Sequence, residues 1–193
     1  TYNCIYEKTT IPNIVNSTQR DAAPQIDAVS RDTALVTVTI GGNDIRFTSS
    51  TFACAGKAPA DNCTANLDQA AISASVKQLP ARLEAMLDAI HAKAPQAIVV
   101  LVAYPRVFPT DAINCRELEL SSNDTAYLAA LGQKLEAAFV SATSGQRNLI
   151  ADAYVLAEGH GPCATSERWV NGAQVANTGV RYHPTAEGHI EMA

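Results

Sequence analysis

The stretch ALVTVTIGGND, residues 34–44, decides the fold of this chain. Its first seven residues are apolar or β-branched, which predicts a strand covered on both faces, as in a parallel sheet between helices. Gly41 and Gly42 then permit a turn that residues with a Cβ would resist. Asn43 and Asp44 therefore follow the carboxyl end of a strand, where open α/β sheets bind ligands. The alternative is an ordinary turn, since Gly, Asn and Asp are common turn residues.

Two further segments have the character of strands. Residues 97–104, with the sequence AIVVLVAY, form an apolar run that Pro105 ends. This run is the clearest buried strand of the chain, because it has strand length and no polar interruption. Residues 148–153, with the sequence NLIADA, predict a shorter strand.

Two segments between these strands have helical periodicity. Residues 67–94 repeat apolar side chains at spacings of three and four, and Pro80 either kinks this helix or begins a second one. Residues 128–139 repeat the same spacing, and Ser122 or Asn123 is placed to cap that helix. Strands that alternate with helices predict βαβ units, and hence a three-layer αβα sandwich with a parallel sheet.

Composition favours one globular domain and excludes several functions. The chain has 193 residues, of which 47% are hydrophobic, and we expect a single domain over residues 1–193. A net charge of -5 without a basic cluster argues against a nucleic-acid partner. No apolar run approaches the roughly 20 residues that span a bilayer.

The five cysteines indicate disulfides rather than a metal site. Their spacing lacks the CxxC pattern of zinc sites, so an oxidising compartment is the better interpretation. We expect Cys54 to pair with Cys63 and Cys115 with Cys163, which would contribute about 3 and about 4 kcal/mol on the chain-entropy model. Cys4 is then unpaired within this sequence. We expect its partner to lie in sequence upstream of residue 1.

His183 is the histidine best placed for chemistry. It precedes Pro184, which holds its backbone extended at the start of a helix and suits a general base. The alternative is a purely structural His-Pro pair. His189 lies six residues further on, a spacing that does not place two ligands on one helical face, so we expect no metal and no cofactor.

Several motifs in order resemble the SGNH (GDSL) hydrolase family, in particular its secreted, actinomycete-type lipase and esterase branch. The GGND turn at residues 41–44 and the YHP motif at residues 182–184 carry the resemblance. AP at residues 94–95, YPR at residues 104–106 and GHGPC at residues 159–163 match intervening blocks. The resemblance implies the flavodoxin-like SGNH fold, and the cysteine order fits a branch with three disulfides.

The resemblance also implies a role for each motif residue. His183 matches the general base that takes a proton from a serine nucleophile and returns it to the leaving alkoxide. Asn43 matches a side-chain amide that donates to the tetrahedral oxyanion. Gly41 and Gly42 would bring Asn43 up to the reacting carbon, and Asp44 would brace the turn.

The sequence departs from the family pattern in three places. Many members orient the histidine with an Asp three residues before it, whereas Val180 stands here, so we expect the backbone carbonyl of Val180 to do this work. The Gly-Asp-Ser block with the nucleophile is absent, so the chain offers no nucleophile of its own. The second block is CIYEK at residues 4–8, without the glycine whose N–H would join the oxyanion hole.

The missing block has a structural consequence. In the family its strand lies beside the strand that ends at Ile40, so we expect one or more N-terminal strands to be missing and that strand to present an unpaired edge. We predict that the chain needs the missing N-terminal segment, or a partner strand, for stability.

The function that follows is a secreted serine ester hydrolase of lipase or esterase type. Its partners would be an ester substrate and, transiently, a lipid surface. Loss of a triad nucleophile costs on the order of 10⁶ in kcat, so the chain alone would be inactive. The alternative is a non-catalytic SGNH-like protein that uses the same cleft for binding.

Overall fold

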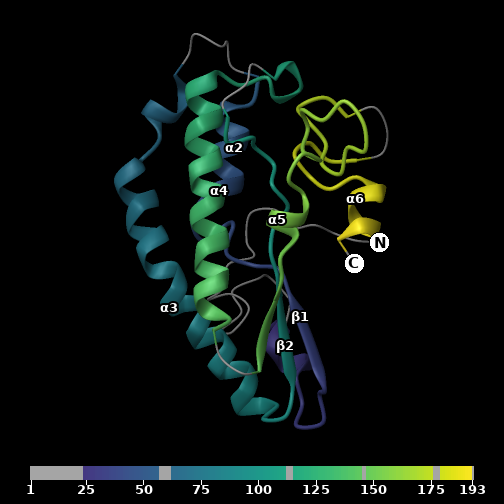
Figure 1. Cartoon of the computed structure of the whole chain (residues 1–193). Coiled ribbons are helices and arrows are strands. Elements are labelled where there is room, and N and C mark those ends of the chain that lie inside the picture. Colours follow the sequence, from purple (N-terminus) through teal and green to yellow (C-terminus); the bar gives the residue numbers. More distant parts are fainter. Residues whose placement is uncertain (1–23, 57–61, 112–114, 145–146, 176–178, 193) are drawn as a thin grey trace.

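Three parallel strands form the sheet of the molecule. The computed structural model describes residues 24–56, 62–111, 115–144, 147–175 and 179–192. Within them β1 (Leu35–Val38), β2 (Ile98–Val102) and β3 (Asn148–Ala151) form one sheet in the order β1-β2-β3 (Figure 1). Leu35 pairs with Ile98 in the first ladder, and Val99 with Asn148 in the second. The predicted α/β class with a parallel sheet is confirmed.

Long helices connect these strands. Helix α3 (Gln69–Lys93) joins β1 to β2, and α4 (Ser122–Ala142) joins β2 to β3. Because both connections cross in the same direction and such crossovers are right-handed, both helices lie on one face of the sheet (Figure 1). Helix α3 is a single helix with Pro80 inside it, which decides between the two alternatives.

Shorter helices complete the chain. They are η1 (Gln25–Ala28), α2 (Phe47–Cys54), η2 (Cys63–Asn66), η3 (Arg116–Leu118), α5 (Ala153–Leu156) and α6 (Ala186–Glu191). Helix α4 is capped by Ser121, whose hydroxyl accepts the N–H of Asp124, and not by Ser122 or Asn123 as predicted. Ser121 has the extended backbone that a capping residue requires, whereas Ser122 is already helical.

The principal hydrophobic core lies between the sheet and the two long helices. Its fully buried members include Leu79, Leu83 and Met86 from α3, Val99 and Leu101 from β2, and Phe139 from α4. Every second residue of β2 contributes, as the side-chain alternation of a strand requires. One face of the sheet is therefore covered by the two long helices.

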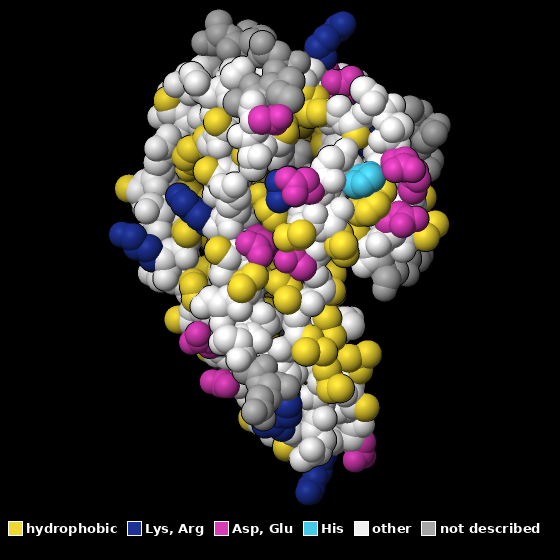
Figure 2. Space-filling model, in the orientation of Figure 1, with side chains coloured by type: hydrophobic (Ala, Val, Ile, Leu, Met, Phe, Trp, Pro, Cys, Tyr) yellow, Lys and Arg dark blue, Asp and Glu magenta, His cyan; other side chains and the backbone are white. Residues whose placement is uncertain are grey.

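The opposite face of the sheet is largely open within the described residues. Leu35, Ile98 and Leu149 are 57%, 47% and 51% exposed, and the register places them on one face. Figure 2 shows yellow apolar side chains over the lower part of the molecule, where Figure 1 places β1 and β2. The prediction that the first strand is covered on both faces is therefore wrong for the described chain, because α3 and α4 share a single face.

Strand β1 forms one edge of the described sheet. It pairs with β2 alone there, and a groove of about 320 Å³ runs beside it. Ile26 and Val29 line the groove from the segment around η1, and Val36 and Met86 line it from β1 and α3. The predicted edge is present in this part of the chain, whereas Cys4 and the CIYEK segment lie outside the described residues.

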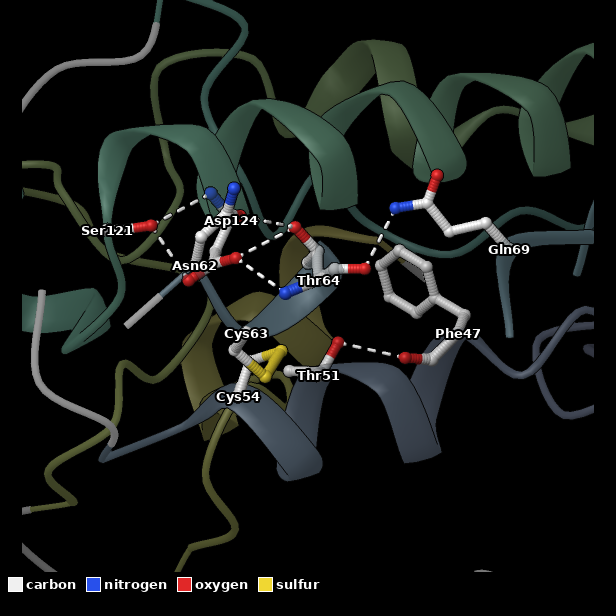
Figure 3. Close-up of a disulfide and its surroundings, with 9 residues drawn as sticks. All are labelled: Phe47, Thr51, Cys54, Asn62, Cys63, Thr64, Gln69, Ser121 and Asp124. Atoms are coloured by element: carbon white, nitrogen blue, oxygen red, sulfur yellow. Dashed lines mark hydrogen bonds between the residues drawn. A yellow bond between two sulfur atoms is a disulfide. The ribbon is translucent and has the colours of Figure 1, made fainter. Parts of the chain in front are cut away.

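Two disulfides tie the irregular segments to helices, and both predicted pairings are confirmed. Cys54 at the end of α2 is bonded to Cys63 at the start of η2 (Figure 3). Asp124 of α4 accepts the N–H and the hydroxyl of Thr64, both at 2.8 Å, so α4 holds the same junction. The second disulfide joins Cys115 to Cys163, across a separation of 48 residues.

A second hydrophobic cluster supports the C-terminal part of the chain. It contains Phe108, Leu118, Leu128, Val170 and Tyr182, all at least nine-tenths buried. These residues come from loops, η3 and α4 rather than from the sheet, so this part of the fold depends on contacts between distant segments. No helix in the described ranges has the length and apolar character that crossing a membrane requires.

Candidate active site

The GGND turn follows β1 directly and leads into α2. Gly41 has a φ of +100°, a conformation that side chains resist, and an added Cβ there would lie 3.2 Å from Leu79. The N–H of Phe47 donates to the carbonyl of Gly42 at 2.8 Å, and that of Arg46 to Asn43 at 3.1 Å. The turn is therefore closed by its own backbone, and Asn43 within it is half-buried.

Asp44 ties this turn to α3. Its side chain is fully buried, and its Oδ1 lies 3.3 Å from Nη1 of Arg82. Arg82 in turn donates from Nη2 to the side chain of Gln78 at 2.8 Å. A buried carboxylate needs such a partner, because an isolated buried charge is strongly unfavourable. The ion pair joins the turn to α3, and the bracing role of Asp44 stays a prediction.

Tyr104, just after β2, packs against the same turn. A Cβ at Gly42 would lie 3.2 Å from both Cζ and the hydroxyl oxygen of Tyr104, so a larger residue there would press on the ring. Burial raises the pKa of Tyr104 to about 12; a hydrogen bond from the Gly42 backbone opposes the shift, and the charge of Asp44 adds to it. The hydroxyl therefore stays protonated at neutral pH.

Sequence reasoning missed both Arg82 and Tyr104. A signal was present for each. Arg82 lies three residues after Leu79 and four before Met86, which places it on the buried face of α3. Tyr104 closes a predicted strand, and the carboxyl ends of parallel strands meet at one edge of a sheet.

His183 lies in an irregular segment that is held by backbone hydrogen bonds. Its N–H donates to the carbonyl of Val180 at 3.2 Å, and its own carbonyl accepts the N–H of Asn171 at 2.8 Å. Its ring Nδ1 lies 2.8 Å from the carbonyl oxygen of Arg181. A carbonyl only accepts hydrogen bonds, so Nδ1 carries the proton of the neutral ring and the lone pair is on Nε2.

The carbonyl that contacts the His183 ring is not the one we predicted. The carbonyl of Val180 accepts the backbone N–H of His183. The ring nitrogen Nδ1 contacts the carbonyl of Arg181 instead. The cause is a left-handed residue between them, since Tyr182 has a φ of +58° and reverses the direction of the chain. The backbone carbonyl in contact with the ring therefore belongs to Arg181, the residue after Val180.

Helix α2 links the two predicted halves of the site. The GGND turn leads directly into this helix, and the ring of Tyr182 makes an edge contact with Phe52 in its second turn, at a centroid distance of 6.0 Å. Residues 41–44 are thus assembled in one turn, and the segment with His183 packs on the helix that follows it.

The other histidines have structural contacts. Nε2 of His91 lies 2.8 Å from the side-chain oxygen of Asn148, and the ring of His160 stacks on Trp169 at 4.1 Å. The described part of the chain contains no group of three His, Cys, Asp or Glu side chains that could hold a metal ion.

A parallel α/β sheet, a GGND turn at a strand end and a His-Pro pair before the last helix together define a protein of the SGNH type. The chain belongs to the GDSL-like Lipase/Acylhydrolase family, whose model matches residues 8–189. The resemblance seen in the sequence is thereby confirmed.

Two similar proteins are lipases of Streptomyces species. The chain is 33% identical to Lipase 2 of Streptomyces coelicolor in an alignment of 181 residues that covers 89% of this chain and 61% of that protein. It is 31% identical to a lipase of Streptomyces rimosus over 169 residues, covering 86% of this chain and 60% of that protein. The chain therefore spans about 60% of the length of these curated relatives.

Solved structures show the same fold. Phospholipase A1 from Streptomyces albidoflavus superimposes with a TM-score of 0.73 at 25% identity, over 94% of this chain and 72% of that one. The extracellular lipase of Streptomyces rimosus gives a TM-score of 0.68 at 24% identity, over 95% of this chain and 74% of that one.

Proposed function

We propose that the intact protein is a secreted carboxylic ester hydrolase of lipase or esterase type, with His183 as general base and Asn43 as an oxyanion donor. The observation that supports this proposal best is the contact between Nδ1 of His183 and the Arg181 carbonyl. It fixes the tautomer that a base needs, because the lone pair on Nε2 can then accept the proton of a serine hydroxyl.

His183 would serve both halves of the reaction. As the serine attacks the ester carbon, Nε2 takes the hydroxyl proton, and the imidazolium then returns that proton to the leaving alkoxide. The Arg181 carbonyl dipole stabilises the charged ring in the way that a carboxylate does in other triads. Water repeats the same sequence to release the acid.

Asn43 would stabilise the tetrahedral intermediate. An oxyanion donor acts best when it is held in place before the reaction, since no reorganisation is then needed. The GGND turn meets this requirement, because Gly42 packs under Tyr104 and Asp44 pairs with Arg82 on α3.

The nucleophile is the remaining requirement. No serine of this sequence stands in a Gly-Asp-Ser motif, and we propose that it lies outside these 193 residues. By itself the chain would then bind but not hydrolyse esters. The substrate is an ester of lipid type, met in solution or at a lipid surface, and the added segment also completes the sheet at β1.

A fluorophosphonate probe tests this proposal, because it bonds covalently to an activated serine with loss of fluoride. We expect labelling of the protein expressed from its complete coding sequence, and none of residues 1–193 alone. His183→Ala should abolish labelling, whereas His189→Ala, on the exposed face of α6, should keep it. A complete protein that takes no label would instead be the non-catalytic binding protein.

A further inference from the structure

Tyr182 has an unusual backbone conformation for its residue type. Its φ is +58°, a region that bulky side chains rarely occupy because the Cβ is crowded there. Such a conformation persists only where surrounding contacts impose it, and such residues cluster at functional sites. Tyr182 directly precedes His183, so the question is what this conformation does for the histidine.

The left-handed backbone at Tyr182 directs the Arg181 carbonyl toward the histidine ring. An extended residue at this position would send the carbonyl of Arg181 and the side chain of His183 apart. The observed reversal brings the carbonyl oxygen to 2.8 Å from Nδ1. The contact that orients the ring therefore depends on the conformation of the residue between its two partners.

Three contacts hold Tyr182 in that conformation. Its hydroxyl donates to the carbonyl of Leu118 at 2.8 Å, and its ring packs on Phe52 and Phe108 at centroid distances of 6.0 and 6.1 Å. Only 6% of the residue is exposed. Because these contacts come from η3, α2 and the loop after β2, they fix the ring from three directions.

We propose that Tyr182 is a positioning residue for His183: its anchored ring enforces the left-handed turn that gives Nδ1 the Arg181 carbonyl and so selects the tautomer of the base. This inference deepens the proposed function and rests on it for its effect on catalysis. The tautomer of His183, however, is a property of the folded chain that can be measured without any reaction.

A tyrosine that merely filled the core would behave differently. Its replacement would lower the stability of the fold, but the tautomer of His183 would stay the same. Tyr154 provides the matched control, because it is similarly buried, at 7% exposed, and packs in the other hydrophobic cluster. Tyr154→Phe removes a buried hydroxyl for which the described residues offer no hydrogen-bond partner.

The experiment uses the protein from its complete coding sequence with Tyr182→Phe, Tyr182→Leu and Tyr154→Phe. Long-range ¹H–¹⁵N NMR of the histidine rings reports which nitrogen of His183 is protonated, and ester hydrolysis gives kcat and KM. We expect a single Nδ1–H tautomer in the unsubstituted protein and in Tyr154→Phe, and a mixture of tautomers in Tyr182→Leu.

The kcat of ester hydrolysis should fall in the variants in which the His183 contact is weakened. We expect Tyr182→Leu to lower kcat roughly 10- to 100-fold at little change in KM, as displacement of a catalytic group does. Tyr182→Phe keeps the ring and should lower kcat about fivefold, the factor that one lost hydrogen bond represents. Tyr154→Phe should leave kcat unchanged.

Each outcome decides the proposal. If folded Tyr182→Leu keeps the Nδ1–H tautomer, or if Tyr154→Phe changes it equally, the positioning role of Tyr182 is overturned. Should Tyr182→Leu not fold, the kcat of Tyr182→Phe decides: a kcat equal to that of the unsubstituted protein would overturn the positioning role. A protein without esterase activity whose tautomer still follows Tyr182 would refute the proposed function and retain the positioning role.

Discussion

The GGND turn and the His183 segment are built in opposite ways. Residues 41–44 follow a strand, close on their own backbone and rest on the core between sheet and helices. Residues 180–185 form no regular element until α6 begins, and they are held by Asn171, Leu118 and Phe52, which are distant in sequence. The C-terminal segment, yellow in Figure 1, also lies on the other side of the molecule from α3.

The contrast shows which half of the site is robust. A turn specified by glycines and backed by a core keeps its shape whenever the core forms. A segment held by single hydrogen bonds and a disulfide depends on each of those links. We therefore expect changes at distant positions to disturb His183 more readily than Asn43, and four predictions test this difference.

Loss of the imidazole should have the largest effect. In the protein from its complete coding sequence, His183→Ala should lower kcat/KM for a chromogenic ester by roughly 10⁴- to 10⁶-fold, because nothing else would take the serine proton. His189→Ala, six residues away, should leave the rate unchanged. A loss smaller than tenfold for His183→Ala would remove this histidine from the mechanism.

The disulfides should separate the two regions. Replacing Cys115 and Cys163 with serine should lower the free energy of unfolding by about 4 kcal/mol, against about 3 kcal/mol for Cys54 and Cys63. The effect is larger for Cys115 and Cys163 because opening the longer loop gives the unfolded chain more conformational entropy. Chemical denaturation measures both values.

The same pair of variants tests where each disulfide acts. Without the Cys115–Cys163 bond, amide hydrogen exchange should accelerate in residues 168–185 and stay slow in residues 41–47. Equal acceleration in both segments would show that the two regions are not independently supported.

Loss of the oxyanion donor should lower kcat less than loss of the base. Asn43→Ala should lower kcat by about 10²- to 10³-fold, or about 3 to 4 kcal/mol, with KM nearly unchanged, since the amide acts only on the developing charge. Asn66→Ala, an exposed asparagine of η2, is the control. A change confined to KM would instead assign Asn43 to substrate binding.

Substitution of Asp124 should have the smallest effect, a loss of folding stability that depends on pH. Burial alone would raise the pKa of Asp124, but hydrogen bonds from Thr64 and Ser121 outweigh it and hold the pKa below its ordinary value of 3.8. A carboxyl with a lowered pKa in the folded state stabilises the fold above the unfolded pKa and loses this contribution as the pH falls.

Asp124→Asn should therefore lower the free energy of unfolding by about 2 kcal/mol at pH 7, and the difference should shrink as the pH drops below about 4. Urea denaturation across this range measures it. Asp88→Asn, an exposed carboxylate of α3, should show no comparable dependence. A difference that stays constant with pH would mean that the charge of Asp124 is not what stabilises the junction.

Local patterns predicted much of the fold. The parallel sheet, the long helix over residues 67–94 and the GGND turn followed from periodicity and glycines, which act over a few residues. The two disulfide pairings were confirmed as well. The exposure of Leu35 and Ile98 was not predictable, because it depends on which face α3 and α4 choose together.

The candidate site shows the same division. Asn43 and His183 were predicted from their motifs, whereas the contacts of Arg82 and Tyr104 with the turn appear only when α3 and β2 pack beside it. The ring of His183 contacts the carbonyl of Arg181 rather than that of Val180, and this choice depends on one backbone angle at Tyr182. Motif spacing carries no information about that angle.

By itself the sequence determined the order of strands and helices, the position of the glycine turn and the residue types available for chemistry, because these follow from local conformational preference and apolar periodicity. Only the tertiary structure decided which carbonyl orients His183 and which side chains clamp Asp44 and Gly42. The physical reason is that these contacts join segments far apart in the chain, and their geometry is set by the packing of whole elements on one another.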